Sequence, residues 1–384
     1  MSSVNKGDLD ILLMVDNNLD VVGGGKESTK IIVEGVKDSY SVALIQPGKI
    51  EKNNIFCETY ELSKYKRMKT VFKNPVAFIK YFYDVYRIIK LNRPKVIHTQ
   101  EQVSFFMVAL LKKLKLVNYS FTLIHTDRGL YTKYGKFIKM IFLFFIKELD
   151  IFITTTKFNM KYWKQAIEKR YSNKEYKVIE NTAGRIYEDL DESRVKSNSR
   201  PLVIGFAGRY CDWKNWPLAE EICNKLKSET DIDFQIYMAV GCLDDKSEKE
   251  TKQMFSRLKE NLHDRFKGEI NVKFEEMEQF YYDIDIFILT SNYNTESFGR
   301  TIVEAMSRKT VALTTNAGGS VEVVGNQDNV CRVANDFVNR ILHFYNNEEL
   351  FENEKRSNLK RVKENYSLNN NLVKHVNMYT NILN

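Results

Sequence analysis

Two glutamates, Glu296 and Glu304, stand eight positions apart in the stretch NTESFGRTIVEAM (294–306). The apolar residues around Glu304 indicate a helix, and Glu296 precedes that helix in a polar loop after an apolar run. A carboxylate on the buried side of a helix is costly unless it is hydrogen-bonded. A pair of sugar hydroxyls would satisfy Glu304, and an ion pair with a neighbouring Lys or Arg is the alternative.

Two cations stand at the end of another apolar run, in GFAGRYCDWKNW (205–216). Arg209 can bind an anion through two parallel N–H groups, whereas Lys214 acts as a point charge. Together they suit a diphosphate. From this segment alone, two ordinary surface cations are the slightly favoured interpretation.

Three glycines lie in VVGGGKES (21–28), between the first expected strand and the first expected helix. Glycines let backbone N–H groups approach an anion, and a helix N-terminus adds a favourable dipole. Gly24 and Gly25 are therefore candidate phosphate contacts. The stretch is neither GxGxxG nor a loop ending in GKS/T, so dinucleotide and Walker-type binding are not indicated, and a tight turn is the alternative.

These candidates must be positioned by a chain in which short β-branched runs alternate with helical patterns. Such alternation predicts parallel sheets that are covered by helices on both faces. A Ser or Thr cap is expected at the start of a helix over 28–36, and a polar linker over 193–201. We expect ligands at the carboxyl ends of the strands. The expected strands are 10–15, 95–99, 119–125, 150–155, 176–180, 202–208, 234–240, 271–274, 284–290 and 310–315.

Length and composition limit the class of protein. The 384 residues, 43% of them hydrophobic, suit two domains with sizeable cores. Five widely spaced cysteines include no CxxC pair, which favours free thiols over disulfides or a zinc site. The start MSSVNKGDLD lacks the apolar segment of a signal peptide. The run MIFLFFI (140–146) is far shorter than the roughly 20 residues of a membrane span. We expect a cytoplasmic protein, soluble or peripheral.

The positive charge of the chain is concentrated in one segment. Residues 64–95 hold ten Lys and Arg and one acid, a local net of +9 against +8 for the whole chain. A helix is predicted from Pro75, with Lys80, Arg87 and Lys90 on one face. The predicted core stripe on another face consists of Val76, Ile79, Tyr83, Tyr86 and Ile89. The basic face, with its aromatic neighbours, suits an anionic membrane surface or is merely solvated. Nucleic acid is disfavoured because no recognition module accompanies it.

With these motifs in order, the sequence resembles the retaining glycosyltransferases of family four, of the bacterial surface-polysaccharide type. The resemblance is carried by ESFGRTIVEAM (296–306) and TTNAGGSVEVV (314–324). Four weaker segments follow the family's order: GGKE (24–27), IHTD (124–127), VIENTAG (178–184) and GRYCDWK (208–214).

The resemblance implies the GT-B fold, an α/β architecture of two doubly wound Rossmann-like domains whose parallel sheets face a central cleft. Residues 1–192 would form the acceptor-binding domain, and residues 201–365 the domain that binds the nucleotide sugar. The last helix, 366–384, would pack back on the first domain.

The same resemblance assigns roles to the candidate residues. Arg209 and Lys214 would hold the diphosphate of the donor and stabilise its charge as it leaves. Glu304 would accept hydrogen bonds from the ribose, and Glu296 would contact the transferred sugar near its anomeric carbon. The remaining donor contacts would come from Gly24, Gly25, the backbone of Ser297, Phe298 and Gly299, and His125 of the first domain. Of these, Glu296, His125, Arg209 and Lys214 form the expected catalytic set.

Some features depart from the family pattern. Ser297 stands where a glycine is usual, and VGCLDD (240–245) has one glycine where the family has two, which leaves the base less certain. YDIDIF (282–287) mimics a metal-binding DxD motif, but its acids open a strand. No metal or cofactor is expected, because Arg209 and Lys214 already neutralise the diphosphate.

The expected function is transfer of a hexose, with retention, from a UDP-linked donor to a hydroxyl of a lipid-linked or surface glycan. The expected partners are the nucleotide sugar, the glycan acceptor and an anionic membrane at its inner face. The alternatives are a soluble or protein acceptor, or an accessory subunit that binds the donor without catalysis. An epimerase or a phosphorylase is disfavoured by the spacing of the glutamates.

Overall fold

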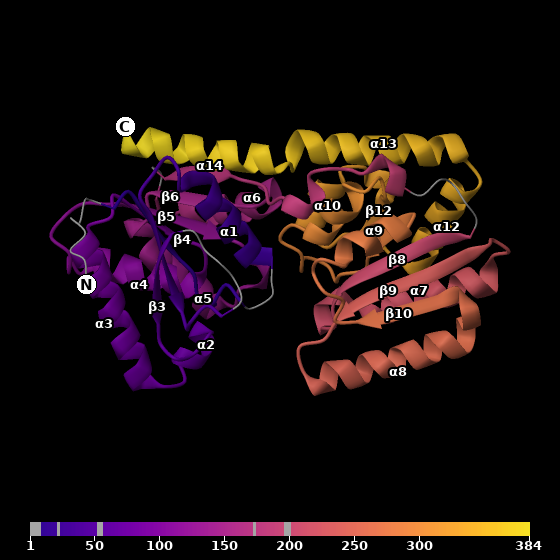
Figure 1. Cartoon of the computed structure of the whole chain (residues 1–384), viewed down its shortest axis with the longest axis horizontal. Coiled ribbons are helices and arrows are strands. Elements are labelled where there is room, and N and C mark those ends of the chain that lie inside the picture. The colour runs from indigo at the N-terminus through magenta and orange to yellow at the C-terminus, as the bar shows by residue number, and fades with distance from the viewer. Residues whose placement is uncertain (1–8, 21–23, 52–56, 172–173, 196–200) are drawn as a thin grey trace. The chain divides into compact units, whose positions relative to one another are not determined.

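A computed structural model describes residues 9–20, 24–51, 57–171, 174–195 and 201–384 of the chain (Figure 1). The chain divides into unit 1, residues 1–180 with 371–384, and unit 2, residues 181–370. This boundary precedes the expected end of the first domain at 192. The residues after it are bound to unit 2, because Arg308 donates to the carbonyl of Tyr187 at 3.2 Å. Of the predicted features, residues 1–8, 21–23 and 196–200 lie outside the described residues.

Unit 1 is built on a seven-stranded parallel sheet in the order β3-β2-β1-β4-β5-β6-β7. The order reverses between β1 and β4, which makes this the switch point where doubly wound sheets bind ligands. The strands are β1 (Ile11–Met14), β2 (Val42–Pro47), β3 (Glu58–Leu62), β4 (Val96–Thr99), β5 (Thr122–Asp127), β6 (Ile151–Thr154) and β7 (Glu175–Val178).

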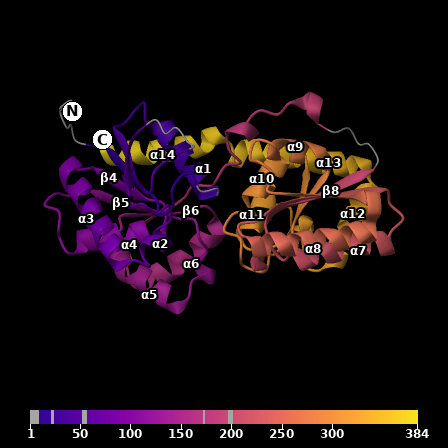
Figure 2. The same ribbon diagram turned by 60° about the horizontal axis from the view of Figure 1, so that its bottom comes forward.

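Helices cover both faces of this sheet (Figures 1 and 2). One face carries α2 (Met68–Val71), α3 (Pro75–Asn92), α4 (Gln102–Lys113), α5 (Lys136–Phe145) and α6 (Lys157–Glu168). The opposite face carries α1 (Gly24–Val36) and the last helix, α14 (Leu368–Leu383). Within the described residues, no helix is long and apolar enough to cross a membrane.

The docking of α14 on unit 1 is a specific, buried contact. Tyr379 has no exposed surface, and its hydroxyl lies 2.6 Å from Nδ1 of His98. Nε2 of the same imidazole lies 2.8 Å from the Thr126 hydroxyl. His98 therefore has a structural position in the core.

Unit 2 is built on a six-stranded parallel sheet in the order β10-β9-β8-β11-β12-β13. Its switch point lies between β8 and β11. The strands are β8 (Leu202–Arg209), β9 (Phe234–Gly241), β10 (Phe266–Ile270), β11 (Ile286–Leu289), β12 (Val311–Thr315) and β13 (Val330–Cys331). The two doubly wound parallel sheets confirm the predicted fold class.

The helices of unit 2 also form two layers. One layer holds α7 (Trp216–Glu229), α8 (Asp245–Leu262) and α12 (Ala334–Tyr345). The other holds α9 (Met277–Asp283), α10 (Arg300–Met306) and α11 (Gly319–Val324). The long α13 (Glu348–Asn365) contributes Phe351 to the first layer and Val362 to the second.

Three local predictions differ from the structure. The strand expected over 271–274 is instead β10, which ends at Ile270 because Asn271 adopts a left-handed φ of 57°. The helix expected from a Ser or Thr cap near residue 28 begins at Gly24, so Ser28 lies inside α1. The predicted strands also did not include β2, β3 and β13.

The predicted core stripe of α3 is wrong. The helix begins at Pro75 as predicted, but its buried residues are Tyr81, Val85, Ile88 and Ile89. Of the predicted stripe, Val76, Ile79 and Tyr83 are 76%, 67% and 56% exposed. Only Ile89 belongs to the core. These apolar side chains therefore share the outer face of α3 with Lys80, Arg87 and Lys90, which are also exposed.

Candidate active site

The candidate residues of unit 2 converge at its switch point. The loop after β8 and the loop after β11 are joined by hydrogen bonds between residues about 80 positions apart. The Thr290 hydroxyl donates to the Lys214 carbonyl at 2.9 Å, and the Asn292 amide donates to the Trp213 carbonyl at 2.8 Å. The adjacent strands β8 and β11 thus place Lys214 and Glu296 together.

Lys214 and Glu296 form a shielded ion pair. Nζ of Lys214 lies 2.8 Å from Oε1 of Glu296, and the two side chains are 14% and 13% exposed. The Ser291 hydroxyl donates to the same carboxylate oxygen at 2.7 Å. Two donors fix this carboxylate, and the surrounding protein screens the lysine charge less than water would. The pair therefore holds a cation and an anion in fixed positions at the carboxyl end of the sheet.

Arg209 is held differently from Lys214. It is the last residue of β8, and its carbonyl accepts a hydrogen bond from the indole of Trp216 at 3.1 Å. Its guanidinium is exposed and lies over the ring of Trp213 at 5.8 Å. The backbone is thus anchored while the charged group faces solvent, where it can reach an anion.

The loop that carries Glu296 is fixed by the loop after β12. The Glu296 amide donates to the Ala317 carbonyl, and the Gly319 amide donates to the Glu296 carbonyl, both at 2.8 Å. Gly299 then adopts a φ of 93° directly before α10, a conformation that disfavours residues with a Cβ. The Phe298 ring is buried against Tyr366, so Phe298 can offer a ligand only its backbone. The neighbouring Ser297 is half-buried.

Glu304 is buried on α10, as the apolar residues around it predicted. The Tyr281 hydroxyl of α9 donates to its Oε2 at 2.7 Å. Burial raises the pKa of this carboxyl, while Arg300, Tyr281 and Lys214 lower it. The positioning role of Tyr281 was missed in the sequence, because a tyrosine in an apolar helix carries no signal of its partner.

The sequence predicts that Glu304 binds the ribose of a UDP-linked donor. On that prediction, we expect Tyr281→Phe to weaken UDP binding by about tenfold, the value of one hydrogen bond to a positioned carboxylate. Loss of this donor removes an interaction that lowers the pKa of Glu304. The pH below which binding fails should therefore move upward. Calorimetric titration of UDP across pH measures both effects. Tyr282→Phe is the matched control, since that hydroxyl accepts from the Asp191 amide at 2.9 Å. An unchanged pH midpoint in Tyr281→Phe would contradict the role.

In unit 1, Gly24 and Gly25 are the first two residues of α1, whereas the sequence predicted that they lie in a loop before the helix. A Cβ built on Gly25 would lie 3.3 Å from Cδ of Arg128, so this glycine allows the arginine side chain to pass closely. The Arg128 guanidinium donates to the Gln100 side chain at 2.7 Å. This cation after β5, near the first turn of α1, was not singled out in the sequence.

His125, which was predicted to contact the sugar or phosphate, is enclosed within unit 1 in this structure. The side chain has no exposed surface and stacks on Phe105 with ring centroids 4.7 Å apart. Its Nδ1 lies 3.0 Å from the Thr99 hydroxyl. Burial lowers the pKa of His125 to about 3, so the imidazole is neutral at physiological pH. The strand register turns this residue into the core, a choice that an isolated strand pattern does not fix.

The acids of the YDIDIF segment have structural partners. Asp285 is buried and accepts a hydrogen bond from the Val203 amide at 2.8 Å, which ties β11 to β8. Gln279 donates to Asp283 at 2.7 Å. Within the described residues, no cluster of three or more His, Cys, Asp or Glu side chains could hold a metal ion.

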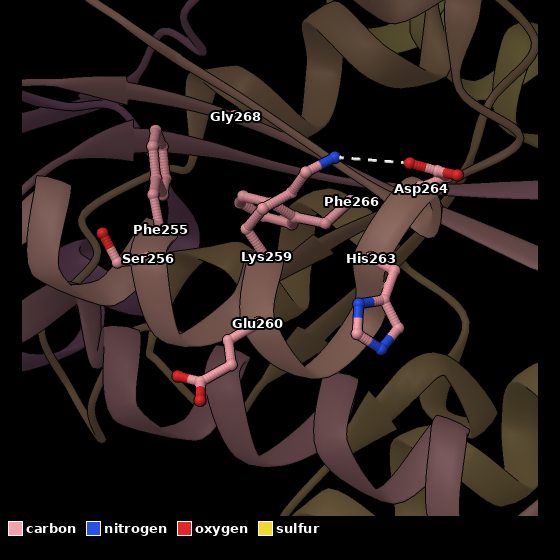
Figure 3. Close-up of a pocket in the computed structure, with 8 residues that line it drawn as sticks. All are labelled: Phe255, Ser256, Lys259, Glu260, His263, Asp264, Phe266 and Gly268. Carbon is pink, nitrogen blue, oxygen red and sulfur yellow. Dashed lines mark ion pairs between the residues drawn. The ribbon is translucent and has the colours of Figure 1, made fainter.

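A shallow hollow of unit 2 lies away from these residues, between α8 and β10 (Figure 3). Two of its charged side chains, Lys259 and Asp264, are directed at one another and lie 3.7 Å apart. None of the candidate residues lines it. The hollow therefore has no part in the candidate site.

The two doubly wound units, with an ion pair at a switch point and a buried glutamate nearby, are the features expected of a GT-B protein. The model of the family described as glycosyl transferases group 1 matches residues 188–366, which is nearly all of unit 2. Unit 2 thus matches this family over nearly its whole length, and the predicted resemblance to GT-B glycosyltransferases is confirmed. Comparison of the sequence with curated proteins gave no match.

Solved structures with the same fold match nearly the whole chain. A glycosyltransferase from Rickettsia africae is 22% identical, with a TM-score of 0.73 and coverage of 99% of both chains. Sucrose-phosphate synthase from Thermosynechococcus elongatus is 14% identical, with a TM-score of 0.79 and coverage of 97% of this chain and 99% of its own. HepE from Anabaena, in complex with UDP, is 14% identical, with a TM-score of 0.75 and coverage of 97% and 100%.

Proposed function

We propose that the protein transfers a hexose, with retention, from a UDP-linked donor to a hydroxyl of a lipid-linked or surface glycan. The observation that carries this proposal is the Lys214–Glu296 ion pair, fixed at 2.8 Å at the switch point of unit 2. Lys214 would stabilise the diphosphate as the leaving group, and Glu296 would contact the sugar that is transferred. The related HepE structures contain UDP and UDP-glucose, which supports UDP as the nucleotide.

In this proposal the cations act on the developing charge of the leaving group. As the bond between the sugar and the diphosphate lengthens, negative charge grows on the diphosphate oxygens. Lys214 is already held in place by Glu296, and the exposed Arg209 would complete the clamp. Fixed charges of this kind stabilise the transition state more than the ground state. No metal is proposed, because the two cations supply the neutralising charge.

The proposed sugar position lies beside Glu296. A carboxylate near the anomeric carbon favours the positive charge of an oxocarbenium-like transition state. The acceptor hydroxyl would attack the face that the diphosphate leaves, which retains the anomeric configuration. Its proton would pass to a diphosphate oxygen, so no separate base is required. Glu304, held by Tyr281, would accept hydrogen bonds from the ribose hydroxyls.

A panel of UDP-, GDP-, ADP- and TDP-sugars, incubated with the purified protein in EDTA, tests the proposal. We expect slow release of the nucleoside diphosphate from one UDP-sugar through transfer to water, and its loss in Glu296→Gln. Thr295→Ser is the matched control, since it retains a hydroxyl at the neighbouring position of the loop. Turnover that requires added Mg²⁺ would contradict the metal-free proposal. Turnover of a GDP-sugar alone would contradict the proposal that the donor nucleotide is UDP.

The panel also separates the two remaining functions. An accessory subunit would bind UDP without turnover even when a glycan acceptor is supplied. The presence of Arg209, Lys214, Glu296 and Glu304 together favours an enzyme. A soluble or protein acceptor would leave the donor chemistry unchanged, and it would be seen as turnover that is indifferent to lipid-linked glycans.

A further inference from the structure

The exposed apolar side chains of this protein are unevenly distributed. Ten of the sixteen large hydrophobic residues that are exposed in the described chain lie between Phe72 and Phe144. Nine of them lie on α3, on α5 or in the turn after α4, and Phe72 lies between α2 and α3. Figures 1 and 2 place α3, α4 and α5 side by side, over the sheet face that shares their core cluster. A concentration of this kind on one helix layer marks an interaction surface.

On α3 the apolar residues lie directly opposite the core. Successive residues of a helix are rotated by about 100°, so Val76, Ile79 and Tyr83 are on the side away from the buried Tyr81 and Val85. They are mostly solvent-exposed, as described above. Lys80, Arg87 and Lys90 flank them on the same exposed face.

On α5 the same pattern recurs. Its buried residue is Phe142, and Phe137, Met140 and Phe144 are 67%, 56% and 53% exposed on the opposite side. The Lys113 ammonium of α4 lies 4.3 Å from the centroid of the Phe144 ring. This contact extends the apolar face of α5 towards the exposed Leu114 and Leu116, so the surface crosses from one helix to the next.

The charge of this helix layer is almost entirely of one sign. Residues 64–147 contain 18 Lys and Arg but three acids. Of those acids, Asp127 is buried and Asp84 is half-buried. The third, Glu101, accepts hydrogen bonds from the Asp16 amide and from Asn17. Acids outside this range pair with Lys66, Lys95, Lys112 and Lys113. The exposed Lys80, Arg87 and Lys90 still give the outer face of α3 an excess of positive charge beside its apolar side chains.

We infer that the outer faces of α3 and α5 form one docking face for an anionic phospholipid surface. We define this docking face as Val76, Ile79, Tyr83, Phe137, Met140 and Phe144, together with the basic residues Lys80, Arg87 and Lys90. The apolar side chains enter the boundary between headgroups and acyl chains, as in helices that lie in the plane of a membrane. The long basic side chains reach the anionic headgroups while their aliphatic stems stay among the lipids.

Lipid fits this face better than a protein partner or a second copy of the chain. The cores of protein interfaces are depleted in lysine, whereas here Lys80, Arg87 and Lys90 share the exposed face of α3 with the apolar side chains. A second copy would bring the same positive charge against itself. Nucleic acid would use the cations but would leave Val76, Ile79 and Met140 without a partner.

The inference deepens the proposed function, because it identifies the surface from which a lipid-linked acceptor would be reached. The inference rests on the proposed function only for the reason why this protein would bind a membrane. Vesicle binding is measured without donor, and UDP binding is measured without vesicles. A failure of one therefore leaves the other standing.

Flotation of the full chain with phosphatidylcholine vesicles, with and without phosphatidylglycerol, tests the inference. We expect binding to the anionic vesicles only. Lys80→Gln/Arg87→Gln/Lys90→Gln should lower the partition coefficient by about 100-fold at low salt, from about fivefold for each charge near the surface. Raising the salt should narrow this difference, because the charges are then screened.

The apolar variant Phe137→Ser/Met140→Ser/Phe144→Ser separates insertion from simple charge attraction. We expect its binding to fall at least tenfold at both low and high salt. Its control is Phe274→Ser/Val333→Ser/Val373→Ser, which removes exposed apolar residues elsewhere. The control for the charge variant is Lys246→Gln/Lys252→Gln/Lys259→Gln on α8 of unit 2. A melting temperature close to that of the wild type shows that each variant is folded.

Three results would overturn the inference. The first is that the wild-type protein does not float with anionic vesicles. The second is that the apolar variant binds as well as its control. The third is a dimer in sedimentation that the apolar variant converts to a monomer, which would assign the face to a second copy.

Discussion

Replacing Lys214 with alanine is expected to lower the rate of sugar transfer by about 100- to 1,000-fold. This is the usual effect of removing one fixed group that stabilises transition-state charge. Lys214 is 14% exposed and held by Glu296 at 2.8 Å, so its charge is positioned before the donor arrives. The rate constant of the bound donor should therefore fall more than the affinity for UDP. Release of UDP in a single turnover, at saturating donor, measures the step directly.

Lys225→Ala is the matched control, because it also removes a lysine of unit 2 that pairs with a carboxylate at 2.8 Å. That variant should retain full activity. The Lys214→Ala/Glu296→Gln double variant adds a second check. If the two side chains act on the same step, the rate loss in the double variant should be smaller than the product of the two single losses. Interacting residues show such a coupling energy in a double-mutant cycle. A change in KM alone for Lys214→Ala would place the lysine in binding and contradict the mechanism.

Glu304→Gln is expected to weaken UDP binding by about 10- to 100-fold. The substitution keeps the shape of the side chain but removes the charge that strengthens hydrogen bonds from two hydroxyls. The sharpest measurement compares UDP with its 2′,3′-dideoxy analogue by calorimetry. The wild-type protein should prefer UDP strongly, and the variant should bind the two ligands with similar affinity. If the variant keeps the wild-type preference, Glu304 does not contact the ribose.

The Glu304→Gln substitution should also change how the melting temperature depends on pH. Burial raises the pKa of Glu304, so its ionised form is disfavoured in the folded protein. The folded state is therefore penalised above the ordinary carboxyl pKa of 4.5, and the penalty disappears as the pH falls below that value. Glutamine carries no such penalty. We expect Glu304→Gln to melt no lower than the wild type at neutral pH, and the two melting temperatures to converge in acid.

Several features of the site followed from the sequence alone. The eight-residue spacing of the glutamates and the apolar residues around Glu304 predicted a buried carboxylate behind a loop. The strand before Arg209 and Lys214 placed both cations at the carboxyl end of a sheet. These features are local, because a run of β-branched residues and a helical period are properties of a few neighbouring positions.

The partners of those residues depended on the order of the strands. Lys214 and Glu296 are 82 positions apart, and they meet because β8 and β11 are neighbours in the sheet. Tyr281 reaches Glu304 because α9 and α10 lie in the same layer. No local pattern records which distant elements become adjacent.

The outer face of α3 shows the same limit most clearly. The sequence determined that Pro75 begins a helix, that the helix carries Lys80, Arg87 and Lys90 on one face, and that a core stripe exists. The predicted stripe was the one around Val76, but the residues around Tyr81 also follow the helical period. Only packing against the sheet decided which stripe is buried. Burial of Tyr81, Val85, Ile88 and Ile89 left the other stripe exposed among the cations. Periodicity defines which residues share a face, and tertiary contacts alone determine which face is removed from water.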